Sequence, residues 1–265
     1  MASFIWSGCK GDHKIHLEKW DLLTRPKMQG GWGLRDLTLF SIALCMKGAW
    51  RGLFSKNLWS SILLDKYLKG MGIVEWLQQG CFNGLNVSII WKGILEVIPW
   101  IIPNIIWKVG DGSKIHIGID CFVGGEGVYK LSDNLIQVLH GKGYYTLEHI
   151  RSNFSQQGTY WLGAAYLSLV GSHIMEWVNY LSFVDRMGIK MSQQSDSLLW
   201  SINVVSGIIM VKLAYDFLYK STVIQPRWWG YGIWGCSAPL KIIYFMWLVL
   251  HDRVLTWNNL LKRGW

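Results

Sequence analysis

The chain has 265 residues, of which 51% are hydrophobic and 16% are charged, and its formal net charge is +9. This length accommodates one or two domains, and the apolar content is ample for a large core. The longest uninterrupted apolar run, Ile242–Leu250, has nine residues and is far shorter than the roughly 20 that a membrane-spanning helix needs, so we expect no membrane partner. The N-terminus has no basic-then-apolar signal layout.

The five cysteines indicate the compartment. Their number is odd, they are far apart, and no C-x-x-C pair occurs. This pattern is typical of a reduced, intracellular protein without structural disulfides, and it does not distinguish nucleus from cytoplasm.

The positive charge is concentrated at the two ends of the chain. Residues 1–70 hold 11 Lys and Arg against 5 Asp and Glu, a net +6. Residues 71–196 have a net −2, with 8 against 10, and residues 197–265 a net +5, with 7 against 2. Two basic ends around a near-neutral middle favour a polyanionic partner such as RNA or DNA, although basic residues that only keep an apolar chain soluble give the same pattern.

Three helices are predicted in the first hundred residues. Apolar residues recur at spacings of three and four over Leu39–Phe54, with Lys47 and Arg51 on the other side. Asn57 is a good N-cap for a second helix over Leu58–Leu68. A third helix is predicted over 87–98, ended by Pro99.

Beyond residue 100 the pattern indicates strands as well as helices. Ile115, Ile117 and Ile119 alternate with less apolar residues after the turn sequence Gly110–Ser113, which predicts a β-hairpin over 104–120. A second hairpin is predicted over 197–211, with its turn near 205–207. Further helices are predicted near 131–139, over 160–184 and over 212–220, and a long helical region from Pro239 to the C-terminus. The expected fold class is α+β, mainly α-helical with two small β-hairpins.

Catalytic and metal-binding patterns are weak. No two aspartates are adjacent, although paired carboxylates are what a two-metal polymerase site requires. Asp111, Asp120 and Asp133 lack the setting of a ribonuclease H site, and the first two are better interpreted as turn and strand-end residues. Cys9, His13 and His16 supply at most three zinc ligands, with no fourth at a suitable spacing. We therefore expect no catalytic residues, no metal site and no cofactor.

Three blocks, in this order, resemble the region that follows the polymerase domain in plant LINE-type (non-LTR) retrotransposon reverse transcriptases. The first runs from "FIWSG" through "KMQGGWGLRDLTLFSIALCMKGAWR" to "LWSSILLDKYL", and the second is "IIWKVGDGSKIHIGID". The third runs from "LLWSINVVSGIIMVKLAYDFLYK" to "LLKRGW" and is similar to the start of the zinc-binding module of these enzymes. The resemblance implies that the polymerase acids lie upstream and the Cys/His zinc ligands just beyond Trp265.

The resemblance also implies a division of the chain. Residues 1–80 correspond to the helical region after the polymerase domain, 81–196 to a middle region, and 197–265 to the truncated N-terminal part of the zinc-binding-like domain. Within the first part, Pro26, Gly30 and Gly31 predict a sharp loop, and Gly33 is expected to let the backbone approach apolar surface closely.

The predicted function is a non-catalytic accessory fragment of a retrotransposon reverse transcriptase that binds RNA or DNA weakly and without sequence preference. No small-molecule substrate is expected. The candidate phosphate-binding residues are Lys27, Arg35, Lys47, Arg51, Lys241, Arg253, Lys262 and Arg263. Most tryptophans, including Trp59, are expected in the core, whereas Trp228, Trp229 and Trp265 lie beside Arg227 or Arg263 and are candidates for stacking on bases. The alternatives are a structural or interaction module and an inert truncated retroelement-derived protein, neither with a nucleic-acid role.

Overall fold

The computed structural model describes residues 17–79, 87–120, 129–152, 161–189, 191–220 and 225–262. The described residues form two compact units. Unit 1 contains 17–42 and, from the other end of the chain, 215–220 and 225–262; unit 2 lies within 43–214. The predicted three-part division refers to family origin and stays a prediction. The boundaries of the two units differ from those of the three predicted parts.

Helices α3, α4 and α6 confirm the predicted periodicity. Helix α3 (Leu37–Phe54) buries six residues at helical spacing. The Asn57 side chain caps α4 (Leu58–Leu68) by accepting a hydrogen bond from the Ser60 backbone N–H at 2.8 Å. Helix α6 (Ile89–Ile101) includes Pro99, so the prediction that this proline ends the helix is wrong. Pro99 falls in the last turn, where it removes a single backbone donor, and buried Ile98 and Ile101 hold the turn in place.

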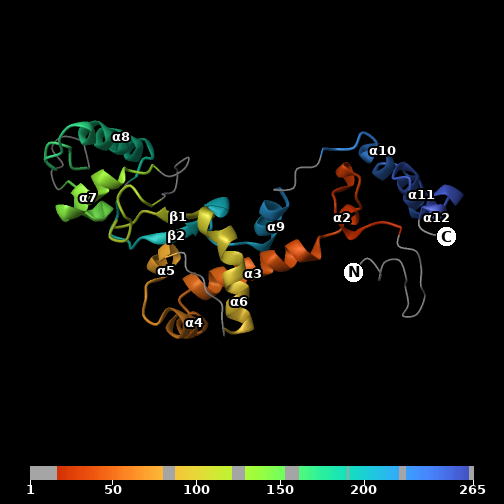
Figure 1. Ribbon diagram of the computed structural model, residues 1–265, viewed down its shortest axis with the longest axis horizontal. Helices are drawn as coiled ribbons and strands as arrows, with labels where there is room; N and C mark the ends of the chain where they lie inside the picture. Colours follow the sequence, from red (N-terminus) through yellow and green to blue (C-terminus); the bar gives the residue numbers. More distant parts are fainter. Residues whose placement is uncertain are drawn as a thin grey trace. The chain divides into compact units, whose positions relative to one another are not determined.

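Neither predicted hairpin forms. Strand β1 (Ile105–Lys108) instead pairs antiparallel with β2 (Ser197–Trp200), with Ile105 opposite Trp200 and Lys108 opposite Ser197 (Figure 1). The first strand of each predicted hairpin is present, as β1 and as β2. Each was expected to pair with the segment that follows it, whereas the two pair with each other. Ile115 and Ile117 are buried as predicted, yet they lie in irregular chain joined to residues 145–147 by backbone hydrogen bonds.

The buried carboxylate of Asp196 explains why the loop after β1 does not form a hairpin turn. Its Oδ1 accepts hydrogen bonds from the backbone N–H groups of Gly110 (2.6 Å) and Gly112 (3.0 Å), and its Oδ2 accepts one from Lys114 (3.0 Å). A side chain at Gly110 would collide with the carbonyl of Gln194. The glycines thus wrap the loop around a carboxylate that lies one residue before β2, which aligns the two strands.

The remaining helices of unit 2 are α5 (Ile73–Gln79), α7 (Asp133–Gly141) and α8 (Ser172–Arg186). Helix α7 confirms the helix predicted near 131–139, and Ser132 caps it. Helix α8 begins twelve residues later than predicted. Residue 160 lies outside the described residues, and 161–171 form turns that include Gly171, which has a positive φ of 62°. Trp177, Tyr180 and Val184 of α8 are fully buried in the core of unit 2.

Unit 1 consists of short elements: α2 (Trp20–Leu23), the 3₁₀ helix η1 (Lys27–Gln29), α10 (Gly230–Trp234), α11 (Leu240–Leu250) and α12 (Trp257–Leu261). The unit boundaries fall within α3 and within α9 (Val211–Lys220), which confirms the helix predicted over 212–220. The helical region predicted from Pro239 contains two helices: after α11 the chain turns at Asp252, which has a positive φ of 53°, and α12 begins at Trp257. Pro239 lies just before α11, at its N-cap.

Among the described helices, α3 alone is long and apolar enough to cross a membrane by length and composition. Its buried residues pack inside the protein, and Lys47 and Arg51 are exposed on it.

Replacing Asp196 tests the interaction that aligns the strands. Hydrogen bonds to a charged group contribute about 1.5–3 kcal/mol each, and Asp196→Ala leaves three backbone donors unpaired. We expect the free energy of unfolding, measured by urea denaturation, to fall by about 3 kcal/mol or more. Asp185→Ala, which removes an exposed aspartate on α8 of the same unit, serves as the matched control and should have a much smaller effect. Equal effects of the two variants would contradict the role of Asp196.

Candidate nucleic-acid interface

The two ends of the chain meet at the carbonyl oxygen of Gly30. The Trp247 indole N–H donates a hydrogen bond to it at 2.7 Å, and His251 Nε2 donates a second at 2.9 Å. Both donors lie at the C-terminal end of α11, more than 200 residues along the chain. Trp247 is fully buried, and burial lowers the pKa of His251, so the imidazole remains a neutral donor near pH 7.

Further hydrogen bonds join the same two segments. The Arg227 backbone N–H donates to the Met28 carbonyl at 2.8 Å, and the Asp36 backbone N–H donates to the Tyr215 hydroxyl at 2.9 Å. The Tyr219 hydroxyl donates to Gln29 Oε1 at 3.3 Å. The loop that follows α2 is therefore held to the C-terminal helices at several points of its backbone.

The sharp loop predicted at Pro26, Gly30 and Gly31 is confirmed, whereas the role predicted for Gly33 is not. Gly30 has a positive φ of 87°, and a Cβ there would lie 3.0 Å from the Trp229 ring, while a Cβ on Gly31 would collide with the Arg25 carbonyl. The prediction that Gly33 allows the close approach is wrong, because its nearest neighbour would be 3.6 Å away. Gly33 is instead required by its positive φ of 69°.

Five predicted phosphate-binding residues are exposed in unit 1: Lys27, Arg35, Lys241, Arg253 and Lys262. Lys47 and Arg51 are exposed on α3 in unit 2. Arg263 lies outside the described residues. The four candidates from the N-terminal end are thus divided between the two units. Lys27 and Arg35 belong to the same unit as the C-terminal candidates.

Arg253 has a different environment from the other candidates. Its Nε forms an ion pair with the Glu18 carboxylate, whose side chain is only 4% exposed. A buried carboxylate requires such a partner, so Arg253 neutralises charge within unit 1. The described residues of unit 1 still contain nine Lys and Arg against five Asp and Glu, a net +4.

An aromatic pocket in unit 1 has a basic residue in its wall. The pocket has a volume of about 370 Å³ and is lined by Lys27, Trp32, Leu34, Trp234, Leu240, Ile243 and Tyr244. The Lys27 ammonium lies 4.9 Å from the centre of the Trp234 ring, within the range of a cation–π interaction. Arg35 and Lys241 directly follow the lining residues Leu34 and Leu240. The sequence could not reveal this pocket, because its rings come from segments about 200 residues apart.

The predictions for tryptophan are confirmed in part. Trp50, Trp91, Trp107, Trp200 and Trp247 are buried. Trp59 is 48% exposed, so its assignment to the core is wrong. Trp229 is buried against Gly30 and His251 and cannot stack on a base, whereas Trp228 is 87% exposed. Trp265 lies outside the described residues.

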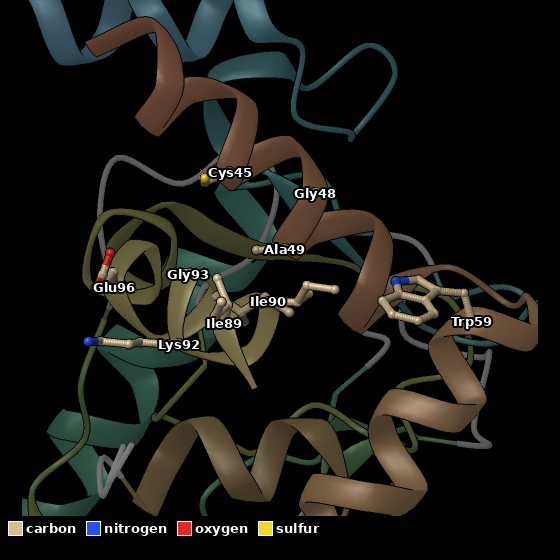
Figure 2. Close-up of a pocket in the computed structure, with 10 residues that line it drawn as sticks. Cys45, Gly48, Ala49, Trp59, Ile89, Ile90, Lys92, Gly93 and Glu96 are labelled. Atoms are coloured by element: carbon tan, nitrogen blue, oxygen red, sulfur yellow. The ribbon is translucent and has the colours of Figure 1, made fainter. Parts of the chain in front are cut away.

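Unit 2 has a larger pocket. Its volume is about 580 Å³, and it lies among α3, α4 and α6. In Figure 2, Cys45, Gly48 and Ala49 line it from α3 and Ile90 extends towards Trp59 of α4, while Lys92 and Glu96 lie on the side away from Trp59. This lining offers no nucleophile with an adjacent base and no row of cations for phosphate.

The described residues contain no group of three His, Cys, Asp or Glu side chains that could hold a metal ion. Asp111 accepts hydrogen bonds from Ser113, which lower its pKa, and the Asp120 carboxylate bonds to His116, which raises the pKa of that imidazole. Asp133 lies in the first turn of α7. The candidate zinc ligands Cys9, His13 and His16 lie outside the described residues.

Comparison with known proteins places this site in a family context. Residues 210–265 match the family model for zinc-binding in reverse transcriptase. A protein of Arabidopsis thaliana named "Putative ribonuclease H protein" is 27% identical over 278 aligned positions, which cover 96% of this chain. An uncharacterized mitochondrial protein of the same plant is 28% identical over 125 positions, 46% of this chain and 78% of its own length.

The chain is thus similar to proteins related to retrotransposon reverse transcriptases. It spans 39% of the length of the first of these relatives. No solved structure matches the chain significantly.

The residues of the matched region do not fit the zinc ion that the family name implies. A structural zinc site takes four ligands, usually Cys and His. Residues 210–265 contain one cysteine, Cys236, and one histidine, His251. His251 donates a hydrogen bond from Nε2 to the Gly30 carbonyl, and Cys236 is exposed.

The His251–Gly30 hydrogen bond predicts a pH dependence. Because burial lowers the pKa of folded His251 below the ordinary 6.5, the unfolded chain binds more protons below about pH 6.5, and stability is lost as the pH falls. His251→Gln keeps an N–H donor but cannot titrate. We expect the wild-type protein to lose more stability than this variant between pH 7 and pH 5, measured by urea denaturation. His173→Gln, in unit 2, is the control and should follow the wild type. Identical pH profiles for wild type and His251→Gln would contradict the role of the neutral imidazole.

Proposed function

We propose that this chain is a non-catalytic, nucleic-acid-binding part of a retrotransposon-derived protein of the reverse transcriptase type. The observation that carries the proposal is the composition of unit 1, which combines exposed cations from both ends of the chain with an aromatic pocket. Lys27, Arg35, Lys241 and Lys262 are exposed in this unit, Lys27 lines the pocket, and no carboxylate lines it.

The distribution of charge supports unit 1 over unit 2 as the interface. Residues 43–214 hold fourteen Lys and Arg against eleven Asp and Glu, a net +3 in more than twice the length of the described part of unit 1. Phosphate binding depends on local density of cations, because each neutralised phosphate releases condensed counterions. A surface of this kind gives non-specific dissociation constants of roughly 10⁻⁴ to 10⁻⁶ M at physiological salt.

The environments of the acids support a non-catalytic role. Each of Asp111, Asp120 and Asp133 has a local structural partner or position, and they belong to no metal-holding group in the described part of the chain. The relative named as a ribonuclease H protein is much longer than this chain, so its activity is not carried over here.

A salt titration of binding tests the interface. We expect affinity for a single-stranded oligonucleotide to fall steeply with salt, by about 0.7 of log–log slope per phosphate contact. Lys27→Ala with Arg35→Ala removes two contacts and should flatten the slope by about 1.4. Lys47→Ala with Arg51→Ala removes the same charge from unit 2 and should change the slope much less. A slope near zero for the wild type would contradict nucleic-acid binding, and equal effects of the two pairs would contradict its assignment to unit 1.

Activity assays test the non-catalytic role. We expect no cleavage of an RNA–DNA hybrid and no primer extension on an RNA template by the purified chain with Mg²⁺ or Mn²⁺, because these reactions need convergent carboxylates. Either product, if abolished by Asp→Asn substitution at Asp111, Asp120 or Asp133, would overturn this part of the proposal.

A further inference from the structure

The aromatic pocket of unit 1 has the features of a site for one flat ring that carries a negative charge at its edge. Trp32, Trp234 and Tyr244 supply aromatic side chains, and all three are only partly buried, so ring surface remains accessible. The volume of about 370 Å³ lies within the range of roughly 300–1,000 Å³ typical of small-molecule pockets.

The charges at the pocket define the ligand further. Lys27 lines the wall with its ammonium over the Trp234 ring, whereas the Arg35 guanidinium lies over the Phe40 ring, 5.5 Å from its centre. The pocket therefore combines apolar aromatic walls with one cationic side chain, that of Lys27. Burial raises the pKa of Tyr244 to about 12, so its phenol stays uncharged and adds no negative charge to the site.

We propose that this pocket binds one unstacked base of a single-stranded nucleic acid, with the adjoining phosphate on Lys27. The inference rests on the proposed function and adds the form of the nucleic acid: a base can enter such a pocket only where it is not paired and stacked within a duplex. The surface accordingly prefers single strands to duplexes at equal phosphate contacts.

The rings are held by the same packing that joins the chain ends. Trp32 lies edge-on to Tyr244 with ring centres 5.2 Å apart, and edge-on to Trp247 at 5.5 Å. Trp247 in turn donates to the Gly30 carbonyl. The walls of the pocket are thus positioned before a ligand arrives, which reduces the entropic cost of binding.

An abasic strand separates base binding from phosphate binding. The probe is a 12-nucleotide single strand of deoxythymidines, compared with a strand of the same length in which every base is replaced by hydrogen. Both present the same phosphates to Lys27, Arg35 and Lys241. We expect the base-bearing strand to bind roughly tenfold tighter, as stacking on aromatic side chains typically gives, with similar salt slopes. Equal affinities with an intact salt slope would overturn the base pocket and leave the proposed function standing; no binding of either strand would defeat both.

Variants assign the effect to the pocket. Trp234→Leu should remove most of the difference between the two strands, and Trp234→Phe, which keeps an aromatic ring, should retain it. Trp59→Leu makes the same change in the pocket of unit 2 and should leave the difference intact. If Trp59→Leu abolishes the difference and Trp234→Leu does not, the assignment to unit 1 is wrong. The comparison of the two strands on the unsubstituted protein decides the proposal even where a variant fails to fold.

Discussion

The carbonyl oxygen of Gly30 is the point on which the arrangement of unit 1 depends. It accepts hydrogen bonds from Trp247 and His251, and the positive φ of Gly30 directs it towards α11. Because Trp247 is fully buried, its indole N–H needs an acceptor inside the protein, and a Cβ at position 30 would lie 3.0 Å from the Trp229 ring. The glycine-rich loop therefore packs against the C-terminal end of α11, and the two segments form an intramolecular interface.

This interface brings the two basic ends of the sequence into one unit. Cations that are more than 200 residues apart, Lys27 and Lys241 among them, occupy one small unit beside a pocket of aromatic rings. Polyanion binding and base stacking use these two kinds of group, and the family relationship to reverse transcriptases is consistent with such a partner. The described residues hold no set of metal ligands in the part that matches the zinc-binding family.

Local features of the sequence predicted local structure well and long-range pairing poorly. The Asn57 cap and the periodicity of α3 were sufficient because both act within a few residues. The pairing of β1 with β2 depends on Asp196, which receives backbone hydrogen bonds from a loop more than 80 residues earlier, and no alternation pattern contains that information. The aromatic pocket was missed for the same reason: its rings look like core residues in each segment, and only folding brings Trp32 near Tyr244.

Photocrosslinking of a single-stranded RNA that carries 4-thiouridine, followed by mass spectrometry of the crosslinked peptides, tests most directly whether the chain ends form one nucleic-acid interface. The arrangement of unit 1 predicts crosslinks both within residues 17–42 and within 225–262, lost together in high salt, because both segments line the same surface. Crosslinks confined to residues 43–214, or to one end of the chain alone, would contradict it.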